Sequence, residues 1–334
     1  MVKVLVELSS EMQAKIEELI KQGRAKDLHS FIRVAIENQL RWEETSEVQV
    51  VTAKNTATLY RRPTVSKSAL MPVPPEDRLE GSLLWGQYSR FLPLKAVVRM
   101  ILNLSEEIYL HEIIPVIMES AIELRRRLSK KDKELRLPRG EQLAVAFPES
   151  TEKSKLRFAH QYVGYVRNDG RIMGFGAQMK FINIINNRIG VTEFGAKFAG
   201  LENPILDKED YSNPLSKEEV QFLLNHIRQH VRGEAEHILW IVRGLSERSM
   251  TRSELNEYMR GFYASNNFKW MWYDSGKEWS DELVETMRAG LTSRLIEMRI
   301  IKTIKVGHSV LYSLKPENEV MLEQWLATTN VKGV

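Results

Sequence analysis

The chain has 334 residues, of which 43% are hydrophobic and 28% charged, so it is long and apolar enough for two or three folded domains. The formal net charge of +4 does not by itself indicate a nucleic-acid-binding protein. The absence of cysteine excludes disulfides and cysteine nucleophiles, and no run of about 18 apolar residues exists to span a membrane, so we expect a cytoplasmic protein without membrane contact.

Residues 2–8 alternate between apolar and polar side chains, which predicts a β-strand. A capping-box pattern at Ser10 predicts a helix that ends near Gly23, and the apolar stripe of a second helix reaches Leu40. The strand has no partner within the first 44 residues, and an unpaired strand with an apolar face is unstable. We therefore expect it to pair with the same strand of a second copy.

The order strand, helix, helix and the segment Leu28–Ile36 (LHSFIRVAI) resemble the ribbon-helix-helix family of the Arc and MetJ type. In that family two chains intertwine, and the paired strands enter the major groove of DNA. The resemblance covers roughly residues 2–42. It implies that residues 1–44 form a homodimeric ribbon-helix-helix domain that binds double-stranded DNA.

The outer face of the predicted ribbon carries Lys3, Leu5 and Glu7. The resemblance places these side chains against base edges, where Lys3 suits guanine or phosphate, Leu5 a thymine methyl and Glu7 cytosine. This triplet departs from the polar or basic triplets usual for the family, so dimerisation alone is the alternative. His29 and Ser30 lie at the start of the second helix, whose N–H groups suit a phosphate, with ordinary capping as the alternative.

Residues 45–80 lack a helical period and contain four prolines, which predicts a linker. Residues 81–210 predict a helical domain in which a helix over 105–128 is followed by a charged loop over 129–139. The segment Arg125–Arg139 holds eight basic and two acidic residues. It either follows phosphates or is a mobile solvated loop, and the loop is the interpretation that we favour.

A helix over 151–167 and a short helix over 174–181 are predicted next. Two short strands around the turn at Asn186 and Asn187 follow, and Thr192 begins another helix. This order resembles the wing and following helix of winged-helix proteins. Residues 81–210 are therefore expected to form a winged-helix-like domain.

Residues 211–334 predict a long helix over 216–246, a helix from Thr251, an aromatic loop over 270–279 and a helix over 280–298. Two alternating strands follow, joined by Gly307 and His308. Helix, helix, hairpin resembles a winged helix-turn-helix, which implies a recognition helix and a basic wing. The candidate DNA-contacting residues of this domain are Arg288, Thr292, Ser293, Arg294 and Arg299, with Lys302, Lys305 and His308 on or beside the wing. The alternative is a solvated charged face on a protein-binding winged helix.

Two further patterns have weaker interpretations. His226, His230, Glu234 and His237 share a face if their helix is continuous, but we expect a polar face and no metal because no metalloprotease motif is present. The aromatic loop is expected to pack against its own domain rather than to stack on bases.

No phosphate-binding loop and no GxSxG motif occurs, so we expect no enzyme and no cofactor. The predicted fold is mainly α, with a ribbon-helix-helix followed by helical winged-helix-like domains with short β-hairpins. The predicted function is a homodimeric, nucleoid-associated transcriptional regulator that binds DNA in a sequence-dependent way. The alternatives are an architectural or segregation factor and a winged-helix adaptor for protein partners.

Overall fold

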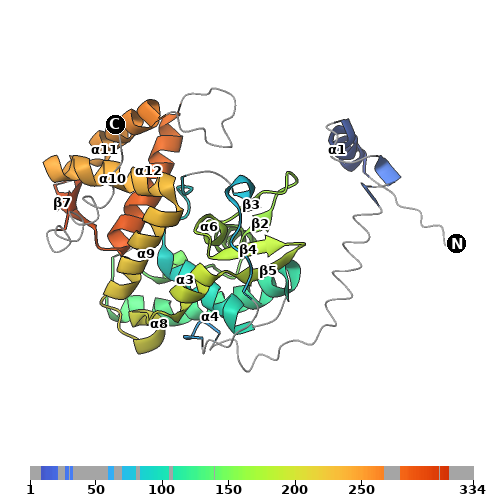
Figure 1. Cartoon of the computed structure of the whole chain (residues 1–334), viewed down its shortest axis with the longest axis horizontal. Helices are drawn as coiled ribbons and strands as arrows, with labels where there is room; N and C mark the ends of the chain where they lie inside the picture. Colours follow the sequence, from blue (N-terminus) through green and yellow to red (C-terminus); the bar gives the residue numbers. More distant parts are fainter. Residues whose placement is uncertain are drawn as a thin grey trace. The chain divides into compact units, whose positions relative to one another are not determined.

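A computed structural model of the chain describes residues 9–21, 27–29, 31–32, 59–63, 70–79, 83–104, 108–138, 140–266, 279–307 and 309–315. The chain divides into two compact units, Met1–Asn55 and Thr56–Val334. The larger unit is mainly helical with short strands, which confirms the mainly α prediction (Figure 1).

The smaller unit contains α1 (Ser10–Lys21), which begins at the predicted capping box. The first turn of the second predicted helix is also present, where the Phe31 N–H donates to the Asp27 carbonyl oxygen at 3.0 Å. The strand predicted over 2–8, and the dimer interface assigned to it, lie outside the described residues.

The larger unit has two parts that follow each other in sequence. The first part contains η2 (Glu76–Arg78), α3 (Phe91–Leu104), β1 (Ile108–Tyr109), α4 (Leu110–Glu134), η3 (Ala144–Ala146), α5 (Glu152–Phe158), a π-helical turn (Ala159–Val163), β2 (Tyr165–Val166), β3 (Ile172–Met173), α6 (Phe175–Gln178), β4 (Ile182–Ile185), β5 (Arg188–Val191), α7 (Glu193–Gly200) and α8 (Pro204–Lys208). The second part contains α9 (Lys217–His230), α10 (Arg232–Glu247), β6 (Met250–Thr251), α11 (Arg252–Asn266), α12 (Asp281–Glu297), β7 (Ile301–Val306) and β8 (Ser309–Leu314). Both predicted hairpins, β4–β5 and β7–β8, are therefore present.

Two three-stranded sheets share one strand order. In the first sheet β1 and β4 both pair with β5, and in the second β6 and β7 both pair with β8, always antiparallel. In each part a two-residue strand that follows a helix joins a later hairpin. Positive φ angles of 51° at Asn186 and 59° at Asn187 form the turn predicted between β4 and β5. The two sheets thus share one strand order, although the helices and strands between β1 and β4 differ from those between β6 and β7.

The described residues of the predicted linker are packed against the rest of the larger unit, unlike those of a free linker. Tyr60 and Leu79 are buried, and Met71 forms an isolated parallel bridge with Thr192. The Arg99 guanidinium donates to the Tyr60 carbonyl oxygen at 3.2 Å. These segments belong to the larger unit because their apolar side chains enter its core.

Helix α4 is longer than the sequence predicts, because part of the expected charged loop over 129–139 is helical to Glu134. Asp132 stabilises this extension. Its carboxylate is buried and accepts the N–H groups of Leu143 at 3.0 Å and Ala144 at 2.9 Å. A tertiary contact therefore overrides the local preference of a charged segment.

Other predicted helices are shorter or interrupted. The helix predicted over 151–167 stops before Gly164, whose φ of 102° leaves the helical region. The helix predicted over 174–181 is limited to the four residues of α6. The helix predicted over 216–246 is two helices, because Val231 has φ −130° and ψ 63° between α9 and α10. The stop at Gly164 makes room for the strand pair β2–β3.

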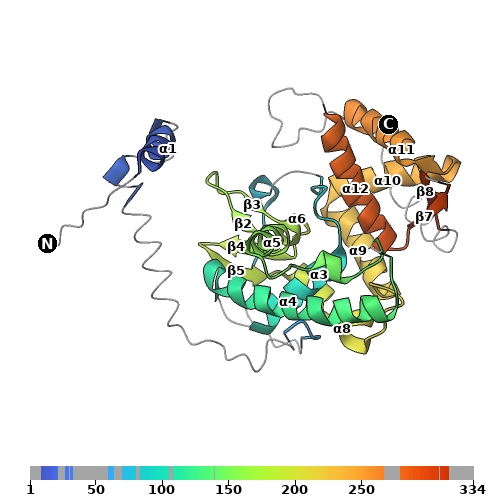
Figure 2. The same cartoon turned by 180° about the vertical axis from the view of Figure 1, so that it is seen from behind.

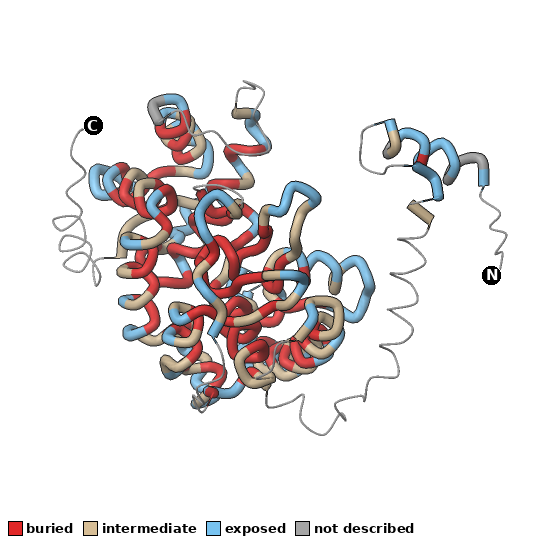
Figure 3. The backbone as a smooth tube through the Cα atoms, turned by 45° about the vertical axis from the view of Figure 1, so that its right-hand side comes forward, coloured by how far each residue is buried: buried red, intermediate tan, exposed pale blue. Residues whose placement is uncertain are grey.

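One hydrophobic core extends through both parts of the larger unit, as the buried segments in Figure 3 show. Residues Thr56–Val334 form one compact unit, which extends across the domain boundary predicted at residue 210. A buried ion pair also joins the two parts. Lys95 Nζ of α3 lies 2.7 Å from Glu219 Oε1 of α9, and burial lowers the pKa of this lysine to about 8.

Helix α12 touches the segment before α3 through two glycines. A Cβ atom at Gly290 would overlap the carbonyl oxygen of Gly86, and a Cβ atom at Gly86 would overlap the backbone of Thr286. Only residues without a side chain allow the backbones to approach this closely.

Glu297, at the end of α12, caps the N-terminus of α3. Its carboxylate accepts the N–H groups of Phe91 and Leu92, the latter at 3.1 Å. Burial raises the pKa of Glu297 to about 7, although Arg90 and these two N–H groups oppose the rise. The folded chain therefore holds this proton more tightly than the unfolded chain, in which the pKa is near the ordinary 4.5.

We expect the ionisation of Glu297 to lower the free energy of unfolding by about 3 kcal/mol as the pH rises from about 4.5 to about 7. Above pH 7 its contribution should change little. Urea unfolding of the wild type and of Glu297→Gln across this range measures the effect. The difference between the two proteins should change with pH inside this window. A constant difference would show that Glu297 ionises normally.

Among the described residues, no helix combines the length and the apolar character needed to cross a bilayer.

Candidate nucleic-acid interface

The predicted recognition helix, α12, is packed inside the larger unit. Arg294 is 1% exposed, and its Nε and Nη2 atoms donate to Glu234 Oε1 at 2.9 and 2.6 Å. A further donor of Arg294 bonds the Tyr88 carbonyl oxygen. Although burial opposes ionisation, Arg294 lowers the pKa of Glu234, so the two form a buried ion pair.

Arg288 and Thr292 are also buried. Arg288 donates to Asn256 Oδ1 at 2.8 Å and to the Tyr312 hydroxyl at 3.0 Å, and Thr292 donates to the Arg288 carbonyl oxygen at 2.8 Å. The prediction that Arg288, Thr292 and Arg294 present donors to DNA is wrong for this fold. Their donors bond partners inside the protein, and no solvent-accessible face holds them.

The outward positions of α12 do not suit a polyanion. The exposed residues are Asp281, Glu282, Glu285, Ala289 and Ile296. Three of these five are acidic and would repel phosphates. Ser293, the remaining predicted contact on this helix, is half-buried.

The predicted wing keeps some accessible cations. Lys305 is exposed on β7, while Lys302 and Arg299 are half-buried. Arg299 has a φ of 60°, in the turn between α12 and β7. His308 lies outside the described residues.

In the smaller unit only His29 of the predicted contacts is described, and it is exposed. Lys3, Leu5, Glu7 and Ser30 lie outside the described residues. Their assignment to base or phosphate contacts remains a prediction.

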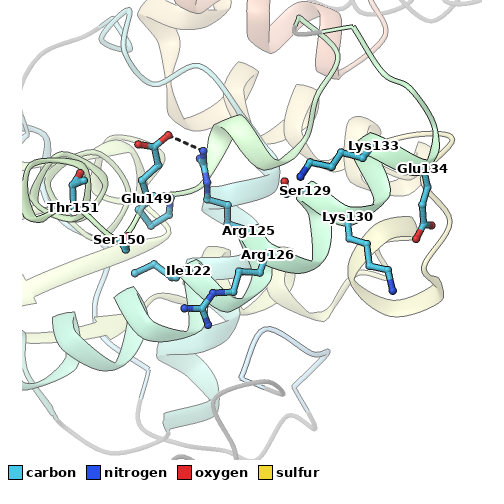
Figure 4. Close-up of a pocket in the computed structure, with 11 residues that line it drawn as sticks. Ile122, Arg125, Arg126, Ser129, Lys130, Lys133, Glu134, Glu149, Ser150 and Thr151 are labelled. Carbon is cyan, nitrogen blue, oxygen red and sulfur yellow. Dashed lines mark hydrogen bonds and ion pairs between the residues drawn. The ribbon is translucent and has the colours of Figure 1, made fainter.

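A basic groove of the larger unit lies along α4, which runs along one side of that unit (Figure 2). We call it the α4 groove. It has a volume of about 730 Å³ and is lined by Ile122, Arg125, Arg126, Ser129, Lys130, Lys133 and Glu134 of α4 and by residues 148–151 before α5 (Figure 4). Four cations and two carboxylates therefore face this groove.

Three of its cations form a row on one face of α4. Arg126, Lys130 and Lys133 are spaced by four and three residues and are all exposed. They span about 10 Å along the helix axis, which corresponds to roughly three phosphates of one DNA strand. Lys130 and Lys133 form no ion pair among the described residues, and the pair of Arg126 with Glu123 at 2.9 Å is exposed and therefore weak.

The fourth cation, Arg125, joins the two walls of the groove through hydrogen bonds. It donates to the carbonyl oxygens of Ala144 at 3.0 Å and Phe147 at 2.6 Å, and to Glu149 at 2.8 Å (Figure 4). Arg125 thereby ties the loop that forms the opposite wall to α4. The row of cations is displayed on a rigid helix beside a fixed wall.

The sequence contained a signal for this site. The predicted charged loop over 129–139 contains much of the basic cluster, and in a loop the spacing of residues does not define a common face. On a helix, the intervals from Arg126 to Lys130 and Lys133 place all three side chains on one face. Helical periodicity applied to the charged residues would have found the row.

The histidine pattern does not gather on one helix face, because α9 ends at His230 and α10 begins after Val231. His226 Nε2 lies 2.7 Å from the Met179 carbonyl oxygen, and burial lowers the pKa of His226 to about 4. His237 Nε2 lies 3.0 Å from the Tyr263 hydroxyl. Within the described ranges, no group of three or more His, Asp or Glu side chains could hold a metal ion.

Of the aromatic loop, only Trp279 is described. Its ring stacks on Tyr263 with centroids 3.8 Å apart, which is packing within its own unit.

No protein-family model matches this sequence, and no characterised protein or solved structure matches it either.

Proposed function

We propose that the chain is a DNA-binding protein without catalytic activity, acting as a homodimer in transcriptional regulation. The observation that carries this proposal is the row of Arg126, Lys130 and Lys133 beside the α4 groove. An exposed row of cations on a rigid helix suits the phosphate backbone of DNA, and such contacts supply sequence-independent affinity.

In this proposal the smaller unit supplies the dimer and the base contacts, as the ribbon-helix-helix resemblance implies. Pairing of two chains doubles the number of α4 rows on one DNA molecule and raises the effective concentration of each. Each row then needs only modest affinity of its own.

We also propose that both parts of the larger unit are winged-helix units. The support is the shared strand order of the two sheets, in which a two-residue strand that follows a helix pairs with the last strand of the hairpin. Because Arg288, Thr292 and Arg294 of α12 are buried, DNA contact by the second part of the larger unit would fall to Lys302 and Lys305 on its wing.

Charge reversal in the row tests the proposed interface. We expect the triple variant Arg126→Glu, Lys130→Glu, Lys133→Glu to bind duplex DNA on the order of 10- to 100-fold more weakly at about 50 mM salt. The slope of log affinity against log salt should become shallower by about 2.7, because three phosphate contacts are lost. Fluorescence anisotropy with a labelled duplex measures both quantities.

The matched control reverses three exposed cations elsewhere in the larger unit, Lys197→Glu, Lys208→Glu and Arg232→Glu, with the same change in net charge. It should lose much less affinity and keep most of the salt slope. Sedimentation should give the same oligomeric state for all variants. Equal losses in both triple variants would show that only net charge matters and would reject the α4 interface.

A protein adaptor is the second candidate, favoured by the edge strand β7. There Ile304 and Val306 are 38% and 54% exposed, which is unusual for an edge strand beside solvent. The absence of duplex binding by the wild type at low salt would favour the adaptor. Weak, length-dependent and cooperative binding would instead favour an architectural factor.

A further inference from the structure

A second groove in the larger unit combines aromatic rings, amides and cations. We call it the Trp85 groove, and its lining includes Trp85, Gln87, Lys153, Arg157, Gln161 and Tyr165. Its volume of about 370 Å³ lies in the range of roughly 300–1,000 Å³ that is usual for small-molecule sites.

Apolar and aromatic surface is accessible in this groove. Trp85 and Tyr165 are half-buried, and Leu156, which also lines it, is 58% exposed. The His160 ring lies 4.6 Å from the Tyr165 ring. Partial burial lowers the pKa of His160, which favours the uncharged form of this ring. Flat rings of this kind suit a flat aromatic ligand.

Two side-chain amides provide polar groups in the same groove. Gln161 Nε2 donates to Gln87 Oε1 at 3.1 Å. A glutamine amide has two N–H donors and a carbonyl oxygen, so this bond leaves each amide capacity for another hydrogen bond. The edge of a nucleobase presents donors and acceptors side by side, which paired amides complement.

Two cations of α5 complete the groove. Lys153 and Arg157 are four residues apart, share a helix face and are both exposed. Neither forms an ion pair with any residue that the structure describes. They suit the phosphate of a ligand whose flat part lies on the rings.

We infer that the Trp85 groove binds one unpaired nucleotide of a DNA strand, with the base against Trp85 and Tyr165 and the phosphate near Lys153 and Arg157. A base inside a duplex cannot offer its face, so the groove recognises single-stranded or locally opened DNA. This inference extends the proposed function, and it assigns to the chain a second nucleic-acid site besides the α4 groove.

Binding of a short labelled oligothymidylate to the full chain, measured by fluorescence anisotropy, tests the inference. Trp85→Ala should weaken single-strand binding about tenfold, and Trp85→Phe should restore most of it, because stacking needs only an aromatic face. The exposed double variant Lys153→Glu, Arg157→Glu should weaken binding on the order of tenfold without altering the urea midpoint. The matched control is Lys155→Glu with Lys197→Glu, which should have a much smaller effect.

Unchanged single-strand affinity in Trp85→Ala and in the Lys153–Arg157 variant would overturn the inference. Displacement of the oligonucleotide from the wild type by oligoglutamate at equal charge would also overturn it, by assigning the groove to an acidic peptide. Duplex affinity, measured in parallel, separates the two proposals. Loss of single-strand binding in Trp85→Ala supports the Trp85 groove even if the α4 variants show that the duplex proposal is wrong.

Discussion

Replacing Arg294 by methionine is expected to lower the free energy of unfolding by about 3–5 kcal/mol. The variant leaves the Glu234 carboxylate buried without its charge partner, since Glu234 is 0% exposed and its Oε1 atom accepts both arginine donors. The Tyr88 carbonyl oxygen also loses a donor. Urea unfolding of wild type and variant gives the difference.

The control on the neighbouring surface is Arg232→Met, which removes an exposed partner of Glu236 on the same helix, α10. This change should cost less than about 1 kcal/mol, as exposed pairs do. The double variant Arg294→Met, Glu234→Leu should recover a large part of the loss, because no buried charge then remains unpaired. A cost of less than about 1 kcal/mol for Arg294→Met would contradict the buried ion pair.

The same variant separates a structural arginine from a DNA-binding one. The folded fraction of Arg294→Met should bind duplex DNA as tightly as the wild type, because the Arg294 side chain does not reach the surface. A selective loss of DNA affinity with normal stability would mean that α12 is exposed when DNA binds. That result would restore the contact predicted from the sequence.

Local patterns in the sequence identified many elements of the larger unit correctly. Helix α12 begins after Ser280, whose hydroxyl accepts the Leu283 N–H, as the predicted helix start requires. The hairpin of β7 and β8 confirms the two alternating strands predicted on either side of Gly307. Capping and periodicity involve neighbours in sequence, so a single sequence contains the information.

The burial of α12 depends on distant partners and was not predictable from such patterns. Charged side chains are rarely buried unless they are paired, so arginines on a predicted recognition helix were expected outside. The partners of Arg294 lie 60 residues away at Glu234 and 206 residues away at Tyr88. Pairings over those separations become visible only in the folded unit, and the one with Tyr88 also joins its two parts.

For the α4 groove, the sequence reveals the basic composition of the segment but not the helix that arranges its charges. Eight basic residues suggested a solvated loop, because local charge density disfavours compact structure. The contacts of Asp132 with Leu143 and Ala144 hold the segment helical to Glu134. The helix then converts a cluster of charges into a row with defined spacing.

The contact between Gly86 and Gly290 makes the packing of α12 sensitive to a single added methyl group. Gly290→Ala is expected to lower the free energy of unfolding by about 3 kcal/mol, because the new methyl group would overlap the Gly86 carbonyl oxygen. Backbone atoms on both sides prevent an easy adjustment, so α12 would have to move away from the segment that leads into α3. Urea unfolding measures the loss.

Gly261→Ala is the matched control, because Gly261 is also helical, in α11, but exposed. The nearest atom to its added Cβ, in the Trp240 ring, is 3.8 Å away, which is ordinary contact. Alanine favours a helix over glycine by about 1 kcal/mol, so this variant should be slightly more stable than the wild type. The two Gly→Ala substitutions should therefore change the free energy of unfolding in opposite directions, because of the two only Gly290 closely approaches the backbone of Gly86. If both variants were stabilised, α12 would not pack against Gly86, and the burial of Arg294 on the same helix would lose its basis.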